Sequence, residues 1–83
     1  MRGAGHAIRR TREPMDRVPV DSGTVLSIGY DRVAFTLEIE FRNGHVYRYF
    51  DVPEAAHRLL VKATSIGGFV NTVIKPRFDC VRV

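Results

Sequence analysis

The chain of 83 residues has a single cysteine, Cys80. One cysteine excludes an intrachain disulfide and a zinc site built on cysteines, and a lone thiol near a chain end fits a reducing compartment. No apolar run approaches the ~20 residues needed to span a membrane. The N-terminus also lacks the apolar stretch of a secretory signal. We therefore expect a cytoplasmic protein without a membrane partner.

Residue patterns for catalysis are also missing. The three histidines, His6, His45 and His57, are scattered over the N-terminal segment, an expected turn and an expected helix. No Cys-His or Ser-His-Asp set has a visible orienting partner, and the histidines lack metal-ligand spacing. The run SIGGFVN does not end in the Gly-Lys-Ser/Thr of a phosphate-binding loop. These observations predict a protein that is not an enzyme and has no cofactor or metal.

The positive charge is concentrated at the N-terminus. Residues 1–20 hold five arginines against two acidic residues and carry +3, whereas residues 21–83 hold eight basic and seven acidic groups and carry +1. The first segment contains Gly and Pro and has no sustained apolar period, so we expect a flexible basic tail over 1–20 and a single domain over 21–83. An arginine-rich arm can bind phosphate backbones without sequence preference; its candidate residues are Arg9, Arg10 and Arg12. The alternatives are a solvated tail or a start codon placed upstream of the true one.

The run Thr36 to Pro53 predicts a β-hairpin. Asn43-Gly44 lies between alternating apolar residues, and Asn-Gly favours a two-residue type I′ turn. This turn pairs Phe41 with Val46, Ile39 with Arg48 and Leu37 with Phe50 on the core face. It pairs Glu40 with Tyr47 and Glu38 with Tyr49 on the other face. A bulge or a longer loop would shift the register and exchange these partners.

The remaining periodicities complete an α+β fold. Thr24 to Tyr30 alternates as a strand, with Leu26, Ile28 and Tyr30 on one side. A helix follows Pro53, and Ser65 is a plausible N-cap for a second short helix over Ile66 to Ile74, which Pro76 ends. Phe78 to Val83 alternates again. We predict a three-stranded antiparallel meander followed by two short helices on one face and a short C-terminal edge strand.

Two groups of residues are candidate binding sites. Tyr47 and Tyr49, with Arg48 between them, can form a sheet platform on which unpaired bases stack, although Glu38 and Glu40 would lie beside it and repel phosphate. The alternative is that the tyrosines are packing residues. The second group combines a capped, glycine-containing helix start with an amide and a cation: Ser65, Gly67, Asn71 and Lys75. It can hold an anion, or it can be a tight corner where the glycines permit close packing.

The order of these motifs resembles the KTSC domain. The matching residues are Ser-Ile-Gly-Tyr-Asp (27–31), Thr-Leu-x-Ile-x-Phe (36–41), Gly44, Tyr-Arg-Tyr (47–49), Val-Pro (52–53), Ser-x-Gly (65–67), Asn71 and Ile74-Lys75. The resemblance covers roughly residues 21–83. It implies a small domain that occurs at the C-terminus of some lysyl-tRNA synthetases and as stand-alone bacterial and phage proteins. The family has no established function, and an RNA-binding role has been suggested for it.

The tail and the resemblance together favour a non-catalytic accessory module that binds nucleic acid, with RNA or tRNA as its partner. The alternative is a protein-interaction module that binds a protein partner, or a second copy of itself, through the C-terminal edge strand. The nearly neutral charge of residues 21–83 motivates this alternative.

Overall fold

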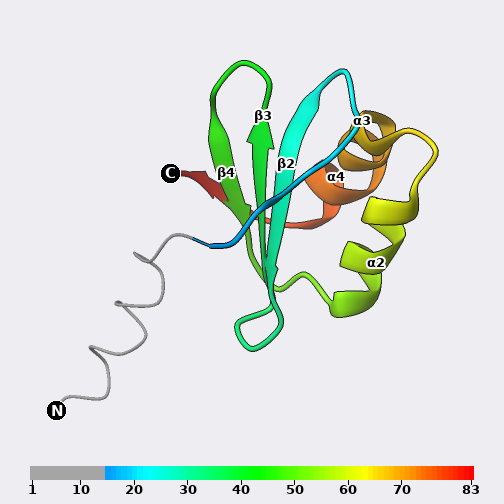
Figure 1. Cartoon of the computed structure of the whole chain (residues 1–83). Coiled ribbons are helices and arrows are strands. Elements are labelled where there is room, and N and C mark those ends of the chain that lie inside the picture. Colours follow the sequence, from blue (N-terminus) through cyan, green and yellow to red (C-terminus); the bar gives the residue numbers. More distant parts are fainter. Residues whose placement is uncertain (1–14) are drawn as a thin grey trace, which may run out of the picture.

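The alternating segments form one antiparallel sheet, which Figure 1 shows with helices on one side. The computed structural model describes residues 15–83. The strands lie in chain order across the sheet: β1 (Val18–Pro19), β2 (Val25–Asp31), β3 (Thr36–Phe41), β4 (Val46–Tyr49) and β5 (Cys80–Arg82). The α+β class is confirmed, and β5 is the expected C-terminal edge strand. The sheet has five strands rather than four, because β1 pairs with β2.

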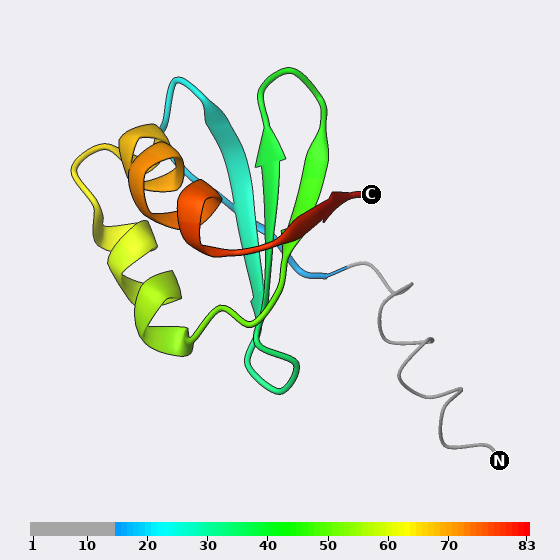
Figure 2. The ribbon, with the colours of Figure 1, turned by 180° about the vertical axis from the view of Figure 1, so that it is seen from behind.

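Two helical segments cover the same face of the sheet, as Figure 2 shows from behind. The first is α2 (Glu54–Lys62), and the second runs without interruption through α3 (Ile66–Phe69), the π-helix η1 (Val70–Ile74) and α4 (Lys75–Arg77). Pro76 was expected to end the helix, but it lies inside the last turn. Proline lacks an N–H and crowds the carbonyl four residues earlier. The preceding turn is wider, and the N–H of Lys75 bonds to the carbonyl of Val70, which accommodates the proline.

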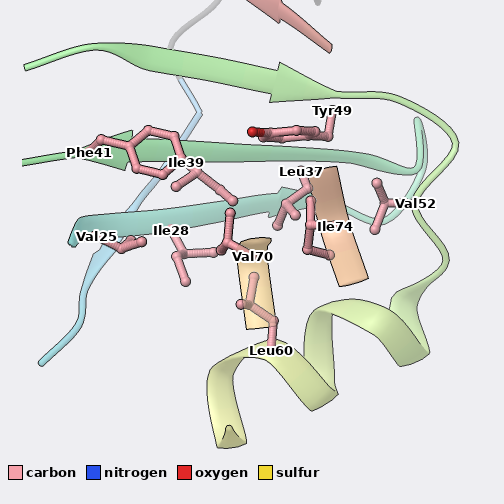
Figure 3. Close-up of a cluster of buried hydrophobic side chains, with 10 residues drawn as sticks. All are labelled: Val25, Ile28, Leu37, Ile39, Phe41, Tyr49, Val52, Leu60, Val70 and Ile74. Carbon is pink, nitrogen blue, oxygen red and sulfur yellow. The ribbon is translucent and has the colours of Figure 1, made fainter. Parts of the chain in front are cut away.

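The hydrophobic core lies between this sheet face and the helices (Figure 3). Its buried members are Val25, Ile28, Leu37, Ile39, Phe41, Tyr49, Val52, Leu60, Val70 and Ile74. The expected facing of β2 is wrong at its start. The register between β2 and β3 shifts between Val25 and Ser27, so Val25 is fully buried while Leu26 is 37% exposed. A bulge of this kind places two residues opposite one and reverses the alternation.

The β3–β4 hairpin has a different register from the one predicted. Its loop is three residues long, because the N–H of Phe41 bonds to the carbonyl of His45 and the N–H of Gly44 bonds to the carbonyl of Phe41, both at 2.9 Å. Gly44 adopts a φ of 94°, which suits glycine in such loops. Leu37 therefore pairs with Tyr49, and Ile39 pairs with Tyr47. The shift of one residue exchanges the faces of every β4 side chain.

The opposite face of the sheet is crossed by residues 15–20, which were expected to be flexible (Figure 1). Arg17 and Arg48 both contact the buried carboxylate of Glu38, at 2.5 and 2.7 Å. Gly29 permits the chain to approach, since a Cβ at this position would lie 2.7 Å from the carbonyl oxygen of Asp16. The segment before β2 is thus attached to the sheet by an ion-paired cluster.

Candidate functional site

A hollow of about 690 Å³ opens on the helix side of the sheet, near the β3–β4 loop. Its walls come from strands β4 and β5, the start of α4, and the loop between β1 and β2. The lining residues are Gly23, Thr24, Phe41, Arg42, Asn43, Tyr47, Tyr49, Lys75 and Cys80. None of these residues is acidic, and two of them are cations.

Tyr49 contributes a buried phenol to the hollow. The residue is only 2% exposed, and in Figure 3 its hydroxyl points along the sheet toward the end where Phe41 lies. Burial, followed by the nearby Cys80 and Tyr47, raises the pKa of Tyr49 to about 12. The hydroxyl is therefore protonated at neutral pH. No group in residues 15–83 makes a hydrogen bond with it, so a buried donor remains available.

Aromatic rings and a cation form the wall near the hairpin loop. The rings of Phe41 and Tyr47 meet edge to face, with centroids 5.8 Å apart. The Nζ of Lys75 lies 5.5 Å from the centroid of the Phe41 ring, which is within the range of a cation–π contact. Tyr47 is only partly buried, so its ring remains accessible for stacking.

Hydrogen bonds hold the rim of the hollow in place. The Nε of Arg42 donates to the carbonyl of Ser22 at 2.6 Å, and the backbone N–H of Arg42 donates to the carbonyl of Thr24 at 2.9 Å. The Ser22 hydroxyl in turn accepts from the N–H groups of Thr24 and Val25. These contacts join the β1–β2 loop to the β3–β4 loop, so the rim is formed before any ligand arrives.

The glutamates lie on the sheet face opposite the core, as predicted, but the two tyrosines do not share that face as the predicted register required. Glu38 is ion-paired with Arg17 and Arg48, and Glu40 accepts a hydrogen bond from the Ser27 hydroxyl at 2.8 Å. The sheet therefore separates both carboxylates from the two tyrosines. Arg48, which was predicted to lie on the core face, is instead directed away from the hollow and toward Glu38.

The second predicted group does not come together as a site. Ser65 is an N-cap, as predicted, and its hydroxyl accepts from the N–H of Gly68 at 3.0 Å. Gly67 packs against Thr24, and a Cβ there would lie 3.0 Å from the Thr24 hydroxyl. Asn71 is exposed and lies outside the hollow. Of the four residues, only Lys75 joins the tyrosines. Arg9, Arg10 and Arg12 lie outside the described residues.

Several lining residues were not predicted to belong to a site, chiefly Thr24, Phe41 and Cys80. Phe41 was predicted to lie on the core face of the sheet. A three-residue loop ending in Gly44 is the signal that would have placed the tyrosines beside them.

Residues 15–83 contain no group of three or more His, Cys, Asp or Glu side chains placed to hold a metal ion. None of the helices there is both long and apolar enough to cross a membrane.

The fold is that of a small α+β domain in which one antiparallel sheet carries helices on a single face. Residues 21–78 match the KTSC domain, and the chain belongs to this family. The crystal structure of a KTSC domain protein from Yersinia pestis superposes with a TM-score of 0.81 at 46% identity, covering 84% of this chain and 99% of that one. The resemblance seen in the sequence is therefore confirmed.

Related sequences occur both alone and within a larger protein. An uncharacterized protein of Stutzerimonas stutzeri is 41% identical over 63 residues, which are 76% of this chain and 89% of that protein. A protein of Tsukamurella paurometabola is 40% identical over 63 residues, or 76% of this chain and 94% of the relative. A lysine–tRNA ligase of Nostoc punctiforme is 36% identical over 58 residues, which are 70% of this chain but 10% of the ligase.

Proposed function

We propose that this KTSC domain is a non-catalytic accessory module that binds single-stranded regions of RNA. The supporting observation is that Tyr47, Phe41 and Lys75 line one hollow while Glu38 and Glu40 lie on the opposite face. An accessible aromatic ring beside cations is the arrangement on which unpaired bases stack while their phosphates are neutralised. The match to a segment of a lysine–tRNA ligase adds support for RNA as the ligand class.

The charge distribution suggests separate roles for the N-terminal arginines and for the hollow in binding RNA. Arg42 and Lys75 provide cations at the hollow, and Arg9, Arg10 and Arg12 provide further positive charge before the described residues. Contacts from the arginines at the N-terminus would add affinity for any phosphate backbone, whereas Tyr47 would favour unpaired bases.

The test is fluorescence anisotropy of the full chain with labelled single-stranded RNA and tRNA over a salt series. Each stacked base contributes about 1–3 kcal/mol, so Tyr47→Leu is expected to weaken binding by roughly 5- to 150-fold. Lys75→Gln should reduce the slope of log K against log salt by about 0.7, the value for one phosphate contact on a single strand. Arg77→Gln is the matched control, because Arg77 is exposed on the same turn but does not line the hollow.

A triple variant in which Arg9, Arg10 and Arg12 are serine separates the two contributions. It is expected to lower affinity for all RNAs alike and to keep the preference for single strands. If this variant abolishes binding while Tyr47→Leu and Lys75→Gln leave it unchanged, the hollow is not an RNA site.

A second candidate function is strand addition by a protein partner or a second copy of the chain at β5. This strand is an exposed sheet edge, and Val81 and Val83 are 49% and 57% exposed. The carbonyl of Asp79 accepts from the N–H of Phe50, and the N–H of Val83 donates to the carbonyl of Val46. Because main-chain groups alternate in direction along a strand, those of Cys80 and Arg82 point away from β4. Arg82→Pro removes an outward N–H without breaking a β4 bond. Sedimentation at high concentration should then show a dimer for the natural chain alone; a monomer in both cases excludes self-association through β5.

A further inference from the structure

The hollow contains hydrogen-bond donors that have no acceptor among residues 15–83. Tyr49 is only 2% exposed, and its hydroxyl has no hydrogen-bond partner within residues 15–83. Burying a hydroxyl without an acceptor is unfavourable, and most buried polar groups in proteins are satisfied. Tyr30 provides a contrast in the same fold, since its hydroxyl donates to the carbonyl of Val52 at 2.5 Å. The unpartnered hydroxyl of Tyr49 therefore points to an acceptor that binds from outside.

A cation lines the same hollow as this donor. Lys75 lies over the Phe41 ring and forms no salt bridge with any carboxylate of the described chain. The Thr24 hydroxyl lines the same hollow, which has no acidic lining residue. A positive charge together with neutral donors from separate elements matches an anion with several acceptor oxygens. The volume also lies within the range of pockets that hold small ligands.

We infer that the hollow is a phosphate pocket, in which the Tyr49 hydroxyl and the Lys75 ammonium group donate to the phosphate oxygens of a nucleotide. This inference rests on the proposed function and specifies how the site would engage RNA. A tetrahedral phosphate offers oxygens in several directions, as donors from β4, α4 and the β1–β2 loop require. The pocket would then select for the phosphate group, and the stacking wall formed by Phe41 and Tyr47 would contact the base.

The experiment is an NMR titration of the full chain with four probes: uridine, uridine monophosphate, inorganic phosphate and a phosphoserine peptide. Uridine monophosphate should bind at least fivefold more tightly than uridine and should shift the amide signals of the lining residues. Tyr49→Phe should reduce that affinity at least fivefold without lowering the melting temperature, because it removes a hydroxyl that has no partner. Tyr30→Phe is the matched control: it removes a bonded hydroxyl, so it should lower the melting temperature and leave the affinity unchanged.

Lys75→Gln provides a second variant if Tyr49→Phe does not fold, and it should also weaken uridine monophosphate at least fivefold. The inference is overturned if uridine and its monophosphate bind equally, or if neither variant changes the affinity. RNA binding that persists in that case, and that depends on Tyr47, would leave the proposed function standing without a phosphate pocket. If phosphate and the phosphoserine peptide bind through Tyr49 while RNA does not bind, the phosphate pocket stands and the RNA function fails.

Discussion

Glu38→Gln should destabilise the protein strongly, because it removes the carboxylate that two arginines share. The Glu38 side chain is 2% exposed, and its oxygens lie 2.5 Å from Arg17 and 2.7 Å from Arg48. Removing one member of a buried ion pair typically costs about 3–5 kcal/mol. The side chains of Arg17 and Arg48 are 30% and 12% exposed, so water can partly solvate the released charges. We therefore expect a loss of about 2–4 kcal/mol in the free energy of unfolding.

Urea denaturation followed by circular dichroism measures this loss, with Glu40→Gln as the matched control. Glu40 lies two residues after Glu38 in β3. Its side chain is 27% exposed and lies 3.8 Å from Arg17. Such a half-solvated pair contributes less than about 1 kcal/mol, and a glutamine there can still accept from Ser27. Equal losses in the two variants, or a loss below about 1 kcal/mol for Glu38→Gln, would refute the assignment of Glu38 as the charge that attaches residues 15–20.

Three further predictions concern close packing and titration. Gly29→Ala should displace residues 15–17, because its Cβ would lie 2.7 Å from the carbonyl oxygen of Asp16; we expect a loss of about 1–3 kcal/mol in urea denaturation, whereas Gly23→Ala, which meets no atom within 4 Å, should be neutral. The phenol of Tyr49 should titrate with a pKa near 12 when followed by ultraviolet absorbance. Because this folded pKa lies above the unfolded value of 10, the free energy of unfolding should fall by about 2–3 kcal/mol as pH rises from about 10 to 12. Complete titration of Tyr49 by pH 10.5 would contradict this prediction. Burial lowers the pKa of His57, whose ring stacks on that of Tyr30 with centroids 4.7 Å apart. Its NMR titration midpoint should therefore lie below 6.5, and its contribution to stability, complete above that pH, should be lost as pH falls. A midpoint above 6.5 would overturn this expectation.

The secondary structure of this chain could be predicted because its signals are local. The hairpin, both helical segments and the C-terminal strand each follow from periodicity or from a terminating residue within a short window. The Ser65 cap was predicted because a cap depends on residues only three positions apart. In contrast, Val18–Pro19 is too short to give an alternating pattern, and the neighbouring Arg17 is held by Glu38, which lies 21 residues further along the chain.

The candidate site was predicted only in part, because it depends on the hairpin register. Tyr47, Tyr49 and Lys75 were identified, but a two-residue loop would have placed both tyrosines beside the glutamates. Asn43-Gly44 is compatible with either a two- or a three-residue loop, and the competing registers differ in which side chains they bury. The observed register buries Tyr49 and pairs Glu38 with two arginines, whereas the predicted one would have placed Arg48 in the core.

The sequence by itself determined the α+β class, the order of the elements from β2 onward and the KTSC family, because these follow from short-range patterns and from the spacing of many separate residues. Only the tertiary structure decided which face of the sheet carries Tyr47 and Tyr49 and which carries Glu38 and Glu40. The physical reason is the two-residue period of a β-strand: one extra residue in a loop reverses every side chain that follows. The energies that select the loop come from burial and ion pairing between segments distant in the chain, such as Arg17 with Glu38.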